Sequence, residues 1–381
     1  MWLVPALRFP EFSREWKRHK LSEICSFYSG GTPSSSKKEF YNGNIPFIRS
    51  GELHKDKTEL FITEDGLNSS AAKLVEIGDL LLALYGATSG DIAISKIKGA
   101  INQAILCIRT KQNKKFIESV WNKHVERLLQ TYLQGGQGNL SADIVKNIPF
   151  YFADLEEQDK LANFISLLDE RISTQNKIIE DLKKLKSAII EIEYSPKDSY
   201  HSHIGGAIVQ ISKRNKDNHL CNVLSVSNRQ GFIKQSEQFE DRNVASDDTS
   251  NYKIVEKNDF AYNPARINVG SIARLTKFET GIVSPMYICF RTKDCLLPEY
   301  LELFFESRNF FYHIQKRLEG SVRLCLSYEE LCNIPIVIPS IEKQKQVDLH
   351  LSKLAQKIDL EMKILQFVQQ QKTYLLHQMF I

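Results

Sequence analysis

The sequence lacks the signatures of membrane proteins and of the common enzyme classes. None of its apolar runs approaches the roughly 20 residues that a transmembrane helix needs. The short apolar stretch at the N-terminus has no basic residue before it and contains Pro5, unlike a signal peptide. There is no GxxxxGK[ST] phosphate loop, HExxH metal motif or GxGxxG dinucleotide motif. We therefore expect a cytoplasmic binding protein with no membrane partner.

Cysteine and charge are also uninformative about catalysis. The 381 residues include seven cysteines, an odd number, and none stands in a CxxC pair. Zinc sites and disulfide frameworks need paired spacings, so we expect reduced thiols and no metal. A net charge of +4 permits nucleic-acid binding without requiring it. The hydrophobic share of 42% supplies cores for two or three domains.

Four short motifs have residue types found in catalytic or metal sites, but their contexts favour structural roles. Asn263-Pro264-Ala265-Arg266 faintly resembles the Asn-Pro-Pro-aromatic motif of amino-methyltransferases, but it lacks the second proline and the aromatic ring. The carboxylate-x-lysine triplets 181–183 and 361–363 fall within a helical pattern and indicate solvated helix faces. His201 and His203 lie in a polar linker and are expected to be exposed. The sequence therefore predicts no catalytic and no metal-binding residue.

What the sequence does contain is an internal duplication. The motif Val-Glu-x-x-Asp begins at Val75 and again 180 residues later at Val255. Cys-x-Arg-Thr begins at Cys107 and returns 182 residues later, and the Glu-x-Gln pattern ending at Gln158 returns 186 residues later. The small drift in offset indicates a whole-domain duplication, because short solenoid repeats have periods of roughly 20–50 residues. A binding face presented twice suits a protein that holds two similar objects.

Each copy reads as a mixed α+β unit. Ser141 and Ser327 precede short helices as N-caps, and Glu330 completes a capping box for the second. Apolar patterning predicts strands at 45–49, 79–85, 91–95, 101–109 and 148–152, and in the second copy at 259–262, 271–275, 282–291 and 334–338. It predicts further helices at 116–133 and 299–318.

A long heptad helix ends each copy. One ladder reads Leu161, Leu168, Gln175, Leu182, Ile189, and its partner reads Ile165, Ile172, Ile179, Lys186. Adding 186 gives the second helix: Val347, Leu354, Glu361, Val368, Leu375, and Leu351, Ile358, Leu365, Lys372. Five heptads indicate a coiled-coil seam, and the shared register predicts an antiparallel pair about a pseudo-twofold axis. The alternative is that each long helix packs only on its own domain.

Several short motifs, taken in order, resemble those of a known family. Lys20 to Ile24, Ser29-Gly30-Gly31-Thr32-Pro33, Ile45 to Leu53 and Asn102-Gln103-Ala104 resemble the recognition domain in specificity subunits of type I restriction–modification enzymes. The ordered set covers essentially the whole chain. The second copy departs from it at Ser227 to Gly231 and at Ser284-Pro285-Met286, so its DNA-contacting residues are less defined.

The resemblance implies an α+β fold with two repeated target-recognition domains, each followed by a long helix, and the two helices paired as an antiparallel coiled coil. Its boundaries are a first recognition domain at 1–153, a central spacer helix at 154–194, a second recognition domain at 195–338 and a C-terminal spacer helix at 339–381.

The resemblance also implies a non-catalytic subunit that reads an asymmetric, bipartite sequence in double-stranded DNA. It would dock methyltransferase subunits, expected in two copies, and a helicase–nuclease restriction subunit can join them. The chain itself would need no cofactor, since S-adenosylmethionine, ATP and Mg would belong to the partners. Three alternatives stay open: the recognition subunit of a type II enzyme with a split target, an enzyme with an unseen motif, and a coiled-coil adaptor without DNA.

A protein that reads duplex DNA directs arginine toward guanine and Asn or Gln toward adenine, and it contacts phosphates with Lys, Ser, Thr and backbone amides. Polar loops of that composition fall at matched places in both copies. In the first copy the predicted DNA-binding residues are Gly31, Thr32, Ser34, Ser35, Arg49, Tyr85, Thr88, Ser89, Asn102, Gln103, Gln137 and Asn139. In the second they are Arg229, Gln230, Asn263, Arg266, Asn268, Ser284 and Arg323.

Overall fold

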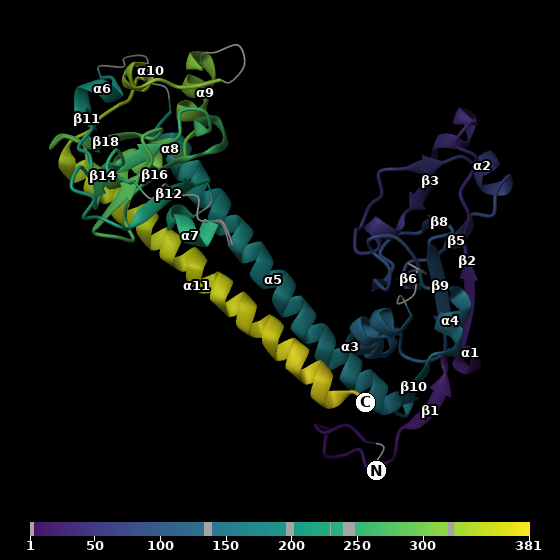
Figure 1. The fold of residues 1–381 in the computed structure, drawn as a ribbon. Coiled ribbons are helices and arrows are strands. Elements are labelled where there is room, and N and C mark those ends of the chain that lie inside the picture. Colours follow the sequence, from purple (N-terminus) through teal and green to yellow (C-terminus); the bar gives the residue numbers. More distant parts are fainter. Residues whose placement is uncertain (1–3, 133–138, 196–201, 229, 239–247, 319–323) are drawn as a thin grey trace. The chain divides into compact units, whose positions relative to one another are not determined.

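The computed structural model describes residues 4–132, 139–195, 202–228, 230–238, 248–318 and 324–381 (Figure 1). These residues form two compact units. Unit 1 comprises residues 1–176 together with 363–381, and unit 2 comprises residues 177–362. The long helices α5 (Leu155–Glu193) and α11 (Ile341–Met379) each contribute one part to each unit. The sequence-based domain boundaries, which keep each helix whole, stay a prediction.

Unit 1 is built on two four-stranded sheets and one two-stranded sheet. The first sheet has the order β2-β9-β6-β7, with β2 (Cys25–Ser29), β9 (Ile105–Thr110), β6 (Leu80–Ala83) and β7 (Ile92–Ile94). The second has the order β4-β3-β8-β5, with β4 (Phe61–Ile62), β3 (Tyr41–Ile48), β8 (Gly99–Ile101) and β5 (Lys73–Val75). β1 (Lys17–Lys20) pairs with β10 (Pro149–Phe152).

Unit 2 repeats the two larger sheets strand for strand. Its first sheet has the order β11-β18-β15-β16, with β11 (Ile208–Ile211), β18 (Ile288–Thr292), β15 (Phe260–Tyr262) and β16 (Ile272–Arg274). Its second has the order β13-β12-β17-β14, with β13 (Gly231–Lys234), β12 (Val223–Ser227), β17 (Thr280–Val283) and β14 (Lys253–Glu256). The matching orders confirm the predicted α+β duplication.

The predicted strands at 101–109 and 282–291 are each two strands, in different sheets. β8 ends at Ile101 and runs parallel to β3, whereas β9 begins at Ile105 in the antiparallel sheet. A tight turn separates them, in which the Asn102 side chain accepts a hydrogen bond from the amide of Ala104. β17 and β18 are divided in the same way, so an apolar run alone does not show where the chain changes sheets.

Two further expectations in the second copy were wrong. The helix predicted at 299–318 is broken into α8 (Pro298–Phe305) and α9 (Arg308–Arg317), because the Ser307 hydroxyl caps a new helix by accepting from the amide of Phe310. The strand predicted at 334–338 is reduced to one antiparallel bridge between His203 and Pro335.

The other helices follow their sequence signals. α3 (Lys114–Tyr132) covers β7, and α4 (Ala142–Asn147) and α10 (Tyr328–Cys332) begin at Ser141 and Ser327, whose hydroxyls accept from the amides three residues later. Single turns complete the fold: α1 (Leu21–Ile24), α2 (Glu64–Asn68), α6 (Ile204–Ala207), α7 (Gln235–Gln238), η1 (Lys38–Phe40), η2 (Ser50–Glu52) and η3 (Ile267–Val269).

The heptad seam pairs the two long helices within each unit. In unit 1, Leu161, Ile165 and Leu168 near the start of α5 share a core with Met379 at the end of α11. In unit 2 the reverse ends meet, since Ile190 near the end of α5 shares a core with Val347 and Leu351 near the start of α11. Opposite ends meet in both units, so the predicted antiparallel pairing is confirmed.

The two lysines that interrupt the seam are both ion-paired. In unit 1, Lys372 lies 2.5 Å from Asp169 on α5, and in unit 2, Lys186 lies 2.6 Å from Glu306 after α8. An ammonium group without a counter-charge in a partly buried seam would destabilise the fold. In each unit a different carboxylate neutralises it. The lysine recurs at the equivalent heptad position of the second helix, but the carboxylate that pairs with it does not recur.

A buried glutamine fixes the start of each long helix. In unit 1, the Gln158 amide donates to the carbonyl of Ala153 and to Gln112, and accepts from the amide of Asn113. In unit 2, Gln344 donates to the carbonyls of Pro339 and Cys295 and accepts from the amide of Leu297. Both glutamines are fully buried. The repeated Glu-x-Gln motif is therefore a structural clamp between helix and sheet.

Removing either clamp should destabilise the protein. Gln158→Ala and Gln344→Ala each leave buried backbone groups without a partner, and we expect each to lower the free energy of unfolding by about 1–3 kcal/mol. Urea unfolding of the full chain measures the change. Gln346→Ala, two residues from Gln344 but exposed on α11, is the matched control. Equal stabilities for all three variants would contradict the clamp.

Candidate nucleic-acid interface

Loops from both sheets of unit 1 gather at one edge. Parallel β3 and β8 pair Ile48 with Ile101, so the chain leaves both strands on the same side. β9 starts next to that exit, and the end of β6 lies beside it, because the amide of Leu84 donates to the carbonyl of Ala104. β2 also ends there, with Ser29 opposite Leu106. This edge, which we call the unit 1 edge, carries most of the residues predicted to bind DNA in the first copy.

Three predicted residues from three different loops are in contact at this edge. The Thr32 hydroxyl donates to the side-chain oxygen of Gln103 over 2.6 Å, and the Tyr85 hydroxyl donates to the main-chain carbonyl of Gln103. Gln103 and Thr32 are exposed, and Tyr85 is half-buried. The cluster holds an amide side chain toward solvent on a rigid support, which is the arrangement that reading a base edge requires.

Glycine is required where the first loop crosses the edge. A side chain on Gly30 would come within 1.8 Å of the Ile101 carbonyl oxygen, and one on Gly31 within 2.6 Å of the Ala71 methyl group. Only glycine permits this approach. Gly31 is buried and supports the loop, whereas Ser34 and Ser35 beyond it are exposed.

In both units the chain returns to the edge after a helix of the domain, α3 in unit 1 and α9 in unit 2. In unit 1 the amide of Leu140 donates to the carbonyl of Leu84, which places exposed Asn139 beside the turn 85–90. In unit 2 the amide of Leu326 donates to the carbonyl of Pro264. Gln137 and Arg323, which were also predicted here, lie outside the described residues, as does Arg229.

Unit 2 has an equivalent edge, the unit 2 edge, with different side chains. The turn after β15 is closed by Asn263, whose side chain accepts from the amide of Ala265, and by Gly270 with a φ of 87°. Arg266 and Asn268 project from this turn and are exposed. Half-buried Ser284 follows β17, and exposed Gln230 lies in the hairpin between β12 and β13. Arg266 and Asn268 thus stand where the turn after β6 in unit 1 has Gly86 and Thr88.

The structure gives several predicted residues internal partners. The Ser89 hydroxyl donates to the carbonyl of Leu84, and half-buried Thr88 accepts from the amide of Asp91 through its carbonyl. The Asn102 side chain accepts a hydrogen bond from the amide of Ala104 within its own turn. These hydrogen bonds shape the loops, and the DNA contacts predicted for these residues stay predictions.

Arg49 is the clearest such case, and it reveals a residue that sequence reasoning missed. Its guanidinium binds Glu52 at 3.2 Å and Glu59 at 3.0 Å. Glu52 is 3% exposed and also accepts from the Thr58 hydroxyl and the Glu59 amide. Burial raises the pKa of Glu52, but the hydrogen bonds from Arg49, Glu59 and Thr58 outweigh it and lower the pKa to about 2. The spacing Arg-x-x-Glu was the available signal.

A second buried carboxylate recurs in both units. Asp79 binds Arg109 at 2.8 Å, and Asp259 binds Arg291 at 2.6 Å. Each carboxylate also accepts from the main-chain amide three residues before it, at Glu76 and Glu256. These contacts explain why the Val-Glu-x-x-Asp and Cys-x-Arg-Thr motifs are repeated: together they pin the strand that leads into the exposed turn.

Neither a metal site nor a membrane-spanning helix is found among the described residues. Within the described parts of the chain, no three His, Cys, Asp or Glu side chains lie together as metal ligands. No helix formed by those residues has the length and apolar character needed to cross a bilayer.

Comparison with known proteins agrees with this reading of the fold. Residues 13–184 match the family model of the type I restriction modification DNA specificity domain. These residues are therefore similar to a type I specificity domain. The match confirms the resemblance that the sequence motifs carry. The type I restriction enzyme EcoR124I/EcoR124II specificity subunit of Escherichia coli is 28% identical over 189 residues, 47% of this chain and 46% of that protein.

The MjaVIII specificity subunit of Methanocaldococcus jannaschii is 25% identical over 196 residues, 49% of this chain and 42% of that protein. The matches thus span about half the length of these relatives. The crystal structure of a type I restriction-modification system S subunit from M. genitalium is similar over 99% of both chains, with a TM-score of 0.60 and 15% identity. That likeness shows that the shared fold extends beyond residues 13–184.

Glu52 should contribute stability that depends on pH. Because its folded pKa lies near 2 and its ordinary value is 4.5, the contribution is complete above pH 4.5 and is lost as pH falls toward 2. We expect Glu52→Gln to lower the free energy of unfolding by about 2–3 kcal/mol at pH 6 and by less at pH 3. Denaturant titrations at both pH values measure this. Glu59→Gln, an exposed partner of the same arginine, should change little, and a pH-independent loss in Glu52→Gln would contradict the assignment.

Proposed function

We propose that this chain is the specificity subunit of a type I restriction–modification system, that it reads an asymmetric bipartite DNA target, and that it carries no catalytic site of its own. The observation that carries the proposal is the presence of two equivalent edges, one in each unit, on the same sheet framework. Each edge presents exposed polar side chains on loops held by internal hydrogen bonds. The match of residues 13–184 to the specificity domain supports DNA as the ligand.

The side chains at the two edges support an asymmetric target. The unit 1 edge presents Thr32 and Gln103, and the unit 2 edge presents Arg266 and Asn268. An arginine favours guanine, while an amide with its oxygen engaged offers its NH₂ donors to base acceptors. The two half-sites should therefore differ in sequence.

The long helices support docking of methyltransferase subunits. Each carries an exposed apolar stripe at seven-residue spacing, away from the seam: Ile178, Leu185 and Ile192 on α5, and Leu360, Phe367 and Tyr374 on α11. Exposed apolar stripes of this kind mark protein interfaces. We propose that methyltransferase subunits, two in number, cover them and supply the S-adenosylmethionine chemistry. ATP and Mg would act on a helicase–nuclease subunit, where one joins.

Methylation mapping tests the proposal. The full chain is expressed with a type I methyltransferase subunit that co-purifies with it, in a host that otherwise lacks the system. We expect one new methylated motif of two specific parts separated by a fixed unspecified gap. Absence of co-purification together with an unchanged methylation pattern would contradict the function.

The two edges should be separable by mutation. Gln103→Ala should relax the sequence requirement of one half-site and Arg266→Ala that of the other, each by about 1–3 kcal/mol of discrimination. Selection of bound duplexes with randomised half-sites measures both. Arg18→Ala on β1 is the control, since that exposed side chain lies outside both edges. Relaxation of the same half-site by both variants would count against the model.

The gap should follow the length of the helices. Each long helix has 39 residues, which is about 57 Å at a rise of 1.5 Å per residue. One heptad added to both helices keeps the seam in register and adds roughly 10 Å, or about three base pairs at 3.4 Å each. We expect a longer preferred gap, with some loss of affinity because the half-site also rotates. Full affinity for the original gap with an intact coiled coil would refute this.

A further inference from the structure

A twelve-residue loop distinguishes the edge of unit 1 from that of unit 2. Residues 49–60 connect β3 to β4, whereas in unit 2 the equivalent strands β12 and β13 are joined by a short hairpin turn. Glu52 organises the long loop from inside through its bonds to Arg49, Thr58 and Glu59. The loop is therefore a built feature of the first copy with no counterpart in the second.

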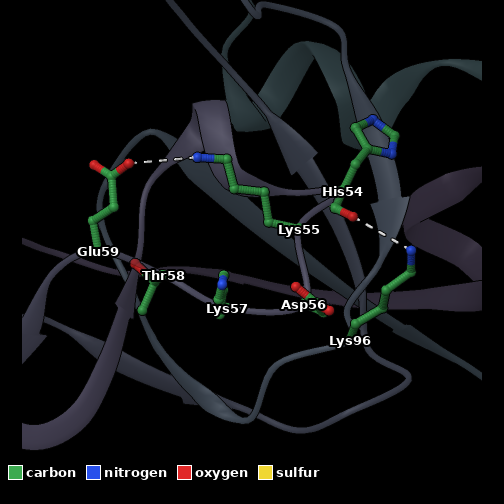
Figure 2. A pocket seen from close by; sticks show the side chains of 7 residues that line it. All are labelled: His54, Lys55, Asp56, Lys57, Thr58, Glu59 and Lys96. Carbon is green, nitrogen blue, oxygen red and sulfur yellow. Dashed lines mark hydrogen bonds and ion pairs between the residues drawn. The ribbon is translucent and has the colours of Figure 1, made fainter. Parts of the chain in front are cut away.

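This loop borders a hollow of about 540 Å³ that is open to solvent, and three lysines line it. Lys55 and Lys57 come from the loop, and Lys96 reaches in from the segment after β7, with its ammonium 3.4 Å from the carbonyl of His54 (Figure 2). The other lining residues are His54, Asp56, Thr58 and Glu59.

The charged side chains around this hollow differ in whether an opposite charge lies close to them. Glu59 is shared between Arg49 and Lys55, the latter at 3.8 Å. His54 is paired with Asp91 at 2.8 Å, a hydrogen bond that raises the pKa of the imidazole against the effect of burial. Among the described residues, no carboxylate lies within ion-pairing distance of Lys57 or Lys96. Asp56 and Glu59 are the carboxylates among the lining residues, and of these Glu59 is already paired with Arg49 and Lys55.

The hollow also lies next to the edge proposed to read DNA. The loop starts at Arg49, directly after Ile48, whose strand neighbour Ile101 precedes Asn102 and Gln103. At its other side, His54 holds Asp91, whose amide donates to the carbonyl of Thr88 in the exposed turn. The loop that carries Lys57, and on which Lys96 rests through the His54 carbonyl, is thus linked to the segments that carry the reading residues.

We propose that Lys57 and Lys96 bind a backbone phosphate of duplex DNA beside the half-site read by unit 1. The proposal rests on the proposed function and adds a contact that gives affinity and register without sequence information. Compact ammonium groups on flexible stems suit phosphate oxygens as point charges. Arg49 serves this contact as a positioning residue, because its guanidinium is engaged by Glu52 and Glu59.

Salt dependence of DNA binding tests this contact. The complex of the full chain with its methyltransferase subunits is titrated with a duplex carrying the target and with one whose unit 1 half-site is scrambled. Lys57→Gln combined with Lys96→Gln should weaken both duplexes by the same factor, about tenfold, and reduce the slope of log K against log salt by about 1–2. Asp56→Asn should act in the opposite direction and strengthen both.

The control carries the same loss of charge elsewhere in unit 1. Lys17→Gln with Lys111→Gln alters exposed lysines on β1 and at the far end of β9 from Gln103, and it should leave the slope unchanged. A slope equal to the control overturns the phosphate contact, as does a loss confined to the correct target. In either case salt-dependent binding by the unchanged protein leaves the proposed function standing. No duplex binding by the unchanged complex overturns both.

Discussion

One parallel strand pair in the second four-stranded sheet of each unit is the constraint on which the rest of the structure depends. In both units, a strand that enters the second sheet parallel to its neighbour must leave on the same side as that neighbour. The next strand then belongs to the other sheet, so the chain has to turn sharply at the exit. The turn 102–104 in unit 1 and the turn 284–287 in unit 2 are the result. Loops that are distant in the sequence meet at those turns, and each unit obtains one polar edge.

Much of each unit exists to keep that edge rigid. The buried carboxylates of Asp79 and Asp259 hold the strands that lead into the exposed turns, and Gln158 and Gln344 clamp the long helices to the same sheets. These four residues explain the repeated motifs better than ligand binding does, because all four are buried. The duplicated motifs therefore belong to the scaffold, whereas the exposed side chains at the two edges differ, as the proposed reading of two different half-sites requires.

The sequence predicted the features that depend on local or periodic signals. Heptad spacing identified both helices, and Ser141 and Ser327 marked helix starts, because capping and amphipathicity act within a few residues. It could not show that 101–109 changes sheets at Asn102, since an apolar run is compatible with either sheet. Nor could it show that Arg49 is ion-paired, because Glu59 meets it only after the loop 49–60 has folded around buried Glu52. The DNA contacts of the individual edge residues stay predictions.

Hydrogen exchange of the assembled complex with and without its target duplex tests the central claim most directly. Two edges that each read one half-site should both show slowed amide exchange on adding DNA, in residues 84–90 and 102–104 of unit 1 and in residues 263–271 and 284–287 of unit 2. A duplex with one half-site scrambled should remove the protection from one edge more than from the other. Protection confined to the long helices, or to a single unit with the intact target, would contradict the account.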